Sequence, residues 1–409
     1  KNRKGRIGME LKNLLSEAEK YKEEIVADRR ALHQNPEVGL SLPKTTAYIK
    51  KRLAAMNVRC TELEGGIVAL IGEAESKSDE NCVLLRADAD ALPVREKTDL
   101  PFASQNGCMH ACGHDMHTAM LLGAARILKE RERELCGTVK LVFQPDEEGF
   151  RGAKTMIAHG ILENPVPSCA LALHVHSGTP TGLVLCGKDT FMAGCTVFRI
   201  TVRGVGCHGA MPETGVDPIY VLTQIYAALS ELTARELSPK TPCSLTVGKF
   251  CAGDAPNVIP ESACLEGTLR LFDETLCEKL TERMKELSEN IARAYRAQGI
   301  CEIVSSAPPL YNDPATLAEA KKCAAALFGE KSVVDVSEGG MGSEDFASYT
   351  RKIPCAYLLL GAGAASEDER YGKPMHNESV VFNEEILPRG AALYAAFAAS
   401  ALNKCAGQN

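Results

Sequence analysis

The stretch Met109-His-Ala-Cys-Gly-His-Asp-Met-His117 places three histidines, a cysteine and an aspartate within nine residues, directly before a run with helical periodicity. Folding alone rarely needs such a density of these side chains, whereas borderline divalent metals prefer imidazole, thiolate and carboxylate ligands. Similar side chains recur downstream in Gln144-Pro-Asp-Glu-Glu-Gly149, Leu173-His-Val-His176 and Pro374-Met-His-Asn377. Together these segments predict a metal site and indicate a metallohydrolase.

Apolar runs around this stretch predict strands that lead to the candidate ligands. The predicted strands end just before Asp88, Glu147 and His174. Strand-like runs alternate with helical runs: strands at 83–87, 139–143 and 170–173, and helices at 115–134 and 153–162. This alternation is typical of an α/β fold with a mostly parallel sheet. Because open sheets of this kind bind ligands beyond the carboxyl ends of their strands, we expect the candidate ligands to meet at one sheet edge.

A second type of pattern begins near residue 196. Residues 196–203 alternate like a half-exposed strand, and long helical patterns and further strands follow up to about residue 306. We expect an inserted α+β domain at residues 196–306. Residues 1–195 and 307–409 would then form one discontinuous α/β domain, and 409 residues exceed what one hydrophobic core usually organises.

Composition excludes several classes of protein. The formal net charge is -7 with interspersed signs, so no basic stripe for nucleic acid is expected, and no apolar run is long enough for a membrane span. The 17 cysteines are odd in number and lack paired spacing. Such cysteines are typical of free thiols in a reducing compartment, so we expect a cytoplasmic protein.

Six motifs together resemble those of the M20 metallopeptidase superfamily, in particular its amidohydrolase branch of hippurate hydrolases, N-acyl-amino-acid amidohydrolases and plant auxin-conjugate hydrolases. The resemblance runs from about Arg29 to the C-terminal helix. The motifs, in family order, are Arg86-Ala-Asp-Ala-Asp-Ala-Leu-Pro93, His110-Ala-Cys-Gly-His-Asp115, Pro145-Asp-Glu-Glu-Gly149, Leu173-His-Val175, Gly206-Cys-His-Gly-Ala210 and Gly342-Ser-Glu-Asp-Phe346. The resemblance implies a zinc-peptidase-like catalytic domain with an inserted ferredoxin-like lid and dimerisation domain.

The resemblance also implies two divalent ions per subunit, Mn²⁺ or Zn²⁺, with Ni²⁺ or Co²⁺ also suited to such ligands. The implied metal ligands are Cys112, His114, Glu148, His174 and His376. Glu147 matches the general base of the family. Without the other motifs, Glu147 and Glu148 would indicate an exposed acidic pair at a helix N-terminus. Cys112 could be a buried thiol like the other cysteines, but its place two residues before His114 favours ligation.

Further positions match the family outside the metal ligands. Asp90 matches an aspartate that orients a ligand, and His208 matches a lid histidine that faces the reacting carbonyl. Asn257 and Arg270 match lid positions that bind substrate. A guanidinium suits recognition of an α-carboxylate, but Arg270 is equally consistent with a cross-strand ion pair.

Several neighbours of the motifs are predicted to have supporting roles. We expect packing or ligand-orienting roles for His110, His117 and His176, and loop-fixing or helix-capping roles for Asp88 and Asp115. The chain departs from the family pattern at Asp146, where a small residue is usual, at His176 and at Cys207. None of these departures removes a ligand, but the acyl preference of any one relative cannot be assumed.

These observations predict a metal-dependent amidohydrolase that cleaves the amide bond of N-acyl amino acids. Its partners would be a small-molecule substrate and a second copy bound through the lid. A metallo-carboxypeptidase or dipeptidase would use the same site and differ on the acyl side of the pocket. A non-catalytic metal- or ligand-binding protein is the remaining alternative, and an intact Glu147 beside intact ligands argues against it.

Overall fold

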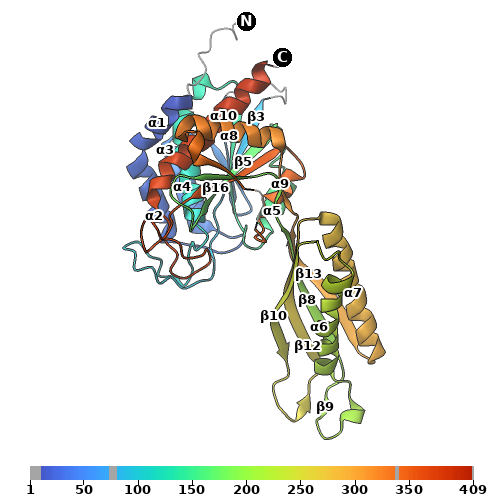
Figure 1. Ribbon diagram of the computed structural model, residues 1–409. Coiled ribbons are helices and arrows are strands. Elements are labelled where there is room, and N and C mark those ends of the chain that lie inside the picture. The colour runs from blue at the N-terminus through green and yellow to red at the C-terminus, as the bar shows by residue number, and fades with distance from the viewer. Residues whose placement is uncertain (1–10, 73–80, 337–339, 408–409) are drawn as a thin grey trace. The chain divides into compact units, whose positions relative to one another are not determined.

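The computed structural model describes residues 11–72, 81–336 and 340–407, which form two compact units. The first unit extends to Asp189, resumes at Tyr311–Glu338 and resumes again at Asp345. The second unit comprises Thr190–Leu310 and the short segment that ends at Glu344. The chain passes between the units within the short strands β7 (Asp189–Met192) and β14 (Leu310–Asn312). In Figure 1 the colour follows residue number from blue to red, so the blue and the red elements both belong to the first unit.

An eight-stranded, mostly parallel sheet organises the first unit. Its strand order is β1 (Cys60–Leu63), β2 (Gly66–Ile71), β4 (Thr138–Gln144), β3 (Cys82–Asp88), β5 (Cys169–His176), β16 (Cys355–Gly361), β6 (Val184–Gly187) and β15 (Val333–Val336). The central pairs β3·β4, β3·β5 and β5·β16 are parallel, and both β3 and β4 are buried along their whole length. This confirms the predicted α/β class with a mostly parallel sheet.

The described part of this unit contains eight α-helices, and all but those at Gly152–Ala158 and Ala347–Thr350 contribute to one hydrophobic core on the sheet. They are α1 (Leu14–Lys20), α2 (Lys22–His33), α3 (Pro43–Ala55), α4 (His114–Glu130), α5 (Gly152–Ala158), α8 (Pro314–Phe328), α9 (Ala347–Thr350) and α10 (Leu387–Gly407), with single 3₁₀ turns at Leu11–Asn13, Glu132–Glu134, Glu330–Ser332 and Glu384–Ile386. Every residue of α4 from His114 to Ala125 is buried, as expected for a helix enclosed on all sides. Glycine permits the close approach of α10, because a Cβ on Gly390 would lie 1.9 Å from the Met120 sulfur.

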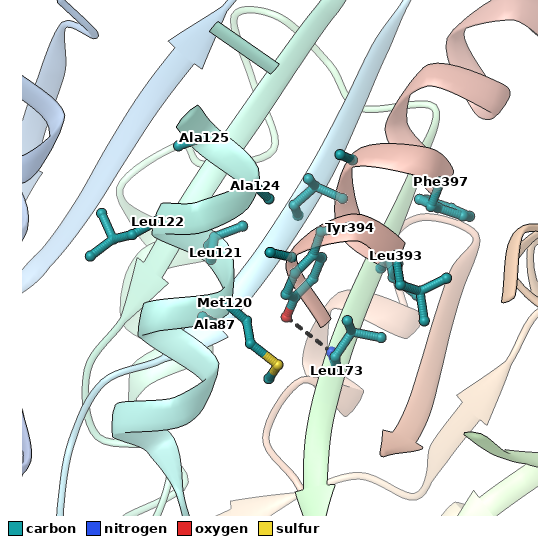
Figure 2. Close-up of a cluster of buried hydrophobic side chains, with 14 of the residues drawn as sticks. Ala87, Met120, Leu121, Leu122, Ala124, Ala125, Leu173, Leu393, Tyr394 and Phe397 are labelled. Atoms are coloured by element: carbon teal, nitrogen blue, oxygen red, sulfur yellow. Dashed lines mark hydrogen bonds between the residues drawn. The ribbon is translucent and has the colours of Figure 1, made fainter. Parts of the chain in front are cut away.

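Strands β3 and β5 part at the point where the site begins. Their ladder ends at the pair Arg86 and Ala172. The hydroxyl of Tyr394 on α10 then donates to the Arg86 carbonyl at 2.7 Å and accepts from the Leu173 amide at 3.1 Å. Figure 2 shows Tyr394 reaching Leu173 beside the packed side chains of α4. One buried side chain thus bonds backbone groups of both strands where they separate.

The second unit is an α+β structure with an antiparallel sheet. The strand order is β10 (Cys243–Ala252), β12 (Ser262–Leu271), β8 (Gly194–Arg203) and β13 (Gln298–Ala307). Helices α6 (Pro218–Arg235) and α7 (Glu274–Ala294) pack on this sheet around their own core (Figure 1). Asp217 and Asp273 cap these helices by accepting hydrogen bonds from backbone amides of the first turn. The 3₁₀ turn Pro212–Thr214 and the small pair β9 (Cys207–His208) and β11 (Val258–Ile259) complete the unit.

Within the described ranges, none of the helices combines the length and the apolar character that crossing a bilayer requires.

Candidate metal centre

Five potential ligands converge where the strands of the first unit end. The thiol of Cys112 belongs to two groups whose ligand atoms all lie within 4.8 Å of one another: Cys112 with His114 and His174, and Cys112 with Glu148 and His376. The structure therefore brings together all five predicted ligand positions. Gly113 makes the tight turn between Cys112 and His114 with φ +84°, and a Cβ there would lie 2.3 Å from a methyl group of Val175.

His114 is oriented so that its Nε2 atom faces the cluster. Its Nδ1 lies 3.0 Å from the Asp90 carbonyl oxygen and 3.3 Å from the Asp90 carboxylate, so Nδ1–H is the donor and Nε2 carries the lone pair. Nε2 is buried and has no hydrogen-bond partner among the described residues. The nearest carboxylate oxygens are those of Glu147 at 3.9 Å and Glu148 at 4.0 Å. A buried acceptor that faces carboxylates suits a bound cation.

His174 and His117 differ in what their rings can bind. His174 Nδ1 lies 2.7 Å from the Val175 carbonyl, so His174 presents its Nε2 atom to the Cys112 sulfur at 3.5 Å. Both nitrogens of His117 are already used, because Nδ1 donates to Asp88 at 2.5 Å and Nε2 accepts from the Val175 amide at 2.8 Å. His117 therefore supports the strand that carries His174 and has no atom left for a metal.

The electrostatics of the cluster favour positive charge. The Nε2 atom of His376 lies 3.2 Å from Glu148, and the neighbouring Cys112 and Glu148 raise the pKa of His376 to about 10. Burial raises the pKa of the Cys112 thiol, so a cation is needed to hold this side chain as a thiolate. The donor set of one thiol, three imidazoles and a carboxylate therefore fits divalent metal ions.

Asp90 links two of the ligands from behind. Its carboxylate accepts from the His114 ring and, at 3.2 Å, from the backbone amide of Glu148. The side chain is fully buried, so both hydrogen bonds form in a region of low dielectric. This geometry matches the predicted orienting role, which stays a prediction until it is tested.

Glu147 lies beside the ligands with its two oxygens in different surroundings. Oε1 accepts from the backbone amide of Asp345 at 3.3 Å, and Oε2 lies 3.9 Å from the His114 ring. The side chain is buried, which excludes the alternative of an exposed acidic pair for Glu147. Oε1 thus accepts from a backbone amide, and Oε2 faces the ligand cluster.

A buried charged network behind the ligands was not predicted from the sequence. Arg86 donates to Asp88 at 2.7 Å and to Asp345 at 2.9 Å, and all three side chains are 1% exposed. Two signals were available: an arginine within the apolar run of β3, and the aspartate of Gly342-Ser-Glu-Asp-Phe346. Charged residues are almost never fully buried unless they are paired, so Arg86 alone predicted an acidic partner without identifying it.

Other neighbours of the motifs have partners of their own. The carboxylate of Asp115 accepts from Arg29 at 2.7 Å and from His33 at 2.8 Å, which ties the start of α4 to α2. Asp115 therefore does not cap α4, whose N-cap residue is Gly113. His176 lies 2.8 Å from the Thr179 hydroxyl, and His110 is buried beside His33 with ring centroids 6.3 Å apart.

The three predicted lid residues all lie in the second unit. His208 is exposed, and its Nδ1 accepts from the Ala210 amide at 3.0 Å, so its Nε2 carries the proton. The Asn257 carbonyl accepts from Gly209, which places Asn257 next to this histidine. Arg270 donates to the Met341 carbonyl at 2.8 Å and to the Ser343 hydroxyl at 3.0 Å, so its bonds go to neutral oxygens rather than to a cross-strand carboxylate.

Comparison with known proteins places this chain in a family of peptidases. Residues 84–400 match the model of peptidase family M20/M25/M40. The chain is 34% identical over 402 residues to thermostable carboxypeptidase 1 of Saccharolobus solfataricus, covering 96% of this chain and 98% of that protein. It is 38% identical over 342 residues to N-acetyl-L-cysteine deacetylase of Bacillus subtilis, covering 83% and 80%. The crystal structure of the Bacillus subtilis YXEP protein, a dinuclear metal-binding peptidase of the M20 family, superposes with a TM-score of 0.74 at 31% identity over 94% of this chain and 99% of that one.

Proposed function

The chain belongs to peptidase family M20/M25/M40, and from this premise we propose that it is a metal-dependent amidohydrolase that removes the acyl group from N-acylated amino acids. One observation carries the proposal: two ligand groups share Cys112, and Glu147 lies beside them with one oxygen facing the cluster. The relative named N-acetyl-L-cysteine deacetylase supports the substrate class. A carboxypeptidase or dipeptidase is the second candidate, and the relative named thermostable carboxypeptidase favours it.

We assign Cys112, His114 and His174 to one divalent ion, and Cys112, Glu148 and His376 to a second. Mn²⁺ and Zn²⁺ are the proposed ions, and Ni²⁺ and Co²⁺ also suit these donors. When bound, such a pair lowers the pKa of a water molecule and polarises the amide carbonyl.

The protein groups around the ligands supply proton transfer and orientation. Glu147 takes the proton of the attacking water and passes it to the leaving amine, because its Oε2 atom faces the cluster. Asp90 holds the His114 ring with its Nε2 lone pair toward the cluster and fixes the backbone of Glu148. Both roles depend on buried hydrogen bonds that keep the groups in one orientation.

Three residues of the second unit are proposed to act on the substrate. His208 is a suitable hydrogen-bond donor to a developing oxyanion, because its Nδ1 already accepts a hydrogen bond and its Nε2 carries the proton. Asn257 and Arg270 are proposed to bind the amino-acid part. Arg270 would exchange its bonds to Met341 and Ser343 for a substrate carboxylate.

We also propose that the second unit mediates a homodimer. β10 is an end strand of its sheet and is exposed along much of its length, and the exposed rings of Phe250 and Tyr226 contact each other edge to face. An exposed edge with aromatic side chains suits pairing with a second copy. The sixteen cysteines whose side chains the structure describes are free thiols, which supports a proposed cytoplasmic location.

The test is the release of free amino acid from N-acetyl, N-benzoyl and longer N-acyl amino acids and from dipeptides. The protein is first stripped with a chelator and then assayed with and without added Mn²⁺ or Zn²⁺. Turnover that returns with metal supports the proposal, and preference for dipeptides favours the second candidate. If none of the substrates is hydrolysed although metal is shown to be bound, both candidate functions are contradicted.

Two variants test the role of Glu147. Glu147→Gln should lower kcat by about 10²- to 10⁴-fold, the usual contribution of a general base, and should leave metal content unchanged. The matched control is Glu62→Gln, which removes an exposed carboxylate that pairs with Lys50 and should leave kcat unchanged. A Glu147→Gln protein that is as active as the parent on every cleaved substrate contradicts the mechanism.

A further inference from the structure

We propose that Asp345 is a positioning residue for Glu147, an inference that rests on the hydrolytic function proposed above. The Asp345 carboxylate accepts hydrogen bonds from three separate elements of the first unit. Arg86 on β3 donates at 2.9 Å, Gln144 on β4 at 2.7 Å and the backbone amide of Ala153 on α5 at 2.8 Å. A side chain fixed from three directions also fixes its own backbone.

The backbone of Asp345 is what contacts the catalytic candidate. Its amide donates to Oε1 of Glu147 at 3.3 Å, whereas Oε2 lies 3.9 Å from the His114 ring. A carboxylate rotates about its last bond, so a donor on one oxygen determines where the other points. The Asp345 side chain anchors the peptide, and the peptide amide orients Glu147.

The Asp345 carboxylate also fixes both ends of the loop that carries Glu147 and Glu148. This loop leaves β4 after Gln144 and enters α5 just before Ala153, and Asp345 bonds a group at each of these points. The loop is also closed internally, because Arg151 donates to the buried carboxylate of Asp146 at 2.6 Å. Asp146, the departure from the family pattern noted above, therefore stiffens the loop in this chain.

Charge compensation strengthens the hydrogen bonds of the Asp345 carboxylate. Arg86 lies between the Asp88 and Asp345 carboxylates, and all three side chains are almost completely buried. Charge-assisted hydrogen bonds in such surroundings are well ordered, because water does not compete for the donors. Replacing Asp345 by asparagine keeps the size of the side chain and removes its charge. The NH₂ group of asparagine cannot accept a hydrogen bond, so at least one of the three donors loses its acceptor.

The main test is Asp345→Asn, assayed with two bound metal ions. We expect kcat to fall about 10- to 100-fold, because a displacement of about 1 Å at a reacting group costs up to this factor. KM should change less than about twofold, since the substrate contacts are not altered, and kcat is compared at saturating metal so that a weaker hold on Glu148 does not contribute. The matched control is Asp28→Asn, which removes a buried carboxylate that bonds Tyr48 and Arg52 in the same unit but away from the ligands.

A double-mutant cycle separates positioning from general destabilisation. If Asp345 acts through Glu147, adding Asp345→Asn to Glu147→Gln should cause no further loss of kcat, because the group being positioned is gone. A full additional loss, an unchanged kcat in Asp345→Asn, or an equal loss in Asp28→Asn would overturn the proposal.

Hydrogen exchange tests the anchor without any substrate. In Asp345→Asn the amide of Ala153 loses its charged acceptor, so peptides covering residues 145–153 should exchange at least tenfold faster than in the parent, and Asp28→Asn should leave them unchanged. Unchanged protection of these peptides in Asp345→Asn would overturn the claim that the Asp345 side chain fixes the loop. Failure of the substrate panel would contradict the proposed function while leaving this result intact, so the two failures are distinguishable.

Discussion

Replacing Tyr394 by phenylalanine removes one oxygen atom and, with it, a hydrogen-bond partner of two buried backbone groups. The hydroxyl donates to the Arg86 carbonyl on β3 and accepts from the Leu173 amide on β5. Losing the partner of a buried donor or acceptor costs about 1 to 3 kcal/mol. The phenyl ring occupies the same space, so no large cavity adds to this cost. With two such groups, we therefore expect Tyr394→Phe to lower the free energy of unfolding by about 2 to 6 kcal/mol.

Urea unfolding followed by far-ultraviolet circular dichroism measures this loss, because the chain contains no tryptophan for fluorescence. The matched control is Tyr21→Phe in the same unit, where the hydroxyl bonds the partly exposed carboxylate of Glu130. Water can replace that partner, so a change within about 0.5 kcal/mol is expected. If Tyr394→Phe is no more destabilised than Tyr21→Phe, the hydroxyl does not join the two strands as described.

Two further perturbations address the ligand shell and the pH response. Asp90→Asn should weaken metal binding about 10- to 100-fold in chelator competition, because an amide group meets a donor from His114 or Glu148, and an affinity within twofold of the parent would contradict this. Burial opposes the charged form of Glu96, but the hydrogen bond and charge of His33 lower its pKa to about 2. The stability that Glu96 contributes is present above about pH 4.5 and is lost as the pH falls toward 2. In Glu96→Gln the urea midpoint should therefore fall less steeply between pH 4.5 and pH 2 than in the parent. The same pH dependence in both proteins would argue against this role of Glu96.

The parts of the fold that depend on local periodicity were predictable from the sequence. The buried strands β3, β4 and β5 are mostly apolar runs, and each leads to site residues because parallel strands present their carboxyl ends at one edge. The strand predicted at residues 244–248 is longer, Cys243–Ala252. Its exposed end lacks alternation and is held by backbone pairing with β12 across a bulge, which side-chain patterns do not reveal.

The parts of the site that depend on distant contacts were not predictable. Asp345 meets Glu147 across 198 residues, and Tyr394 meets Leu173 across 221. In each case the sequence holds a polar residue within or beside an apolar run, which indicates a buried partner but not which one. The conformation of His376 is a further example: it has φ +67°, and its amide bonds the Ala111 carbonyl, which no nearby sequence pattern predicts.

The position of β16 in the sheet of the first unit determines the order in which the chain can complete its fold. β16 lies between β5 and β6, both of which precede the second unit in the sequence, whereas β16 and His376 follow it. During synthesis the core of the second unit is available as soon as residue 310 has emerged. The first unit has to keep a gap beside β5 until residues 355–361 arrive. The last of the five proposed ligands, His376, comes later still, so we expect capture of metal by the full set of five side chains to be a late event in the maturation of this protein.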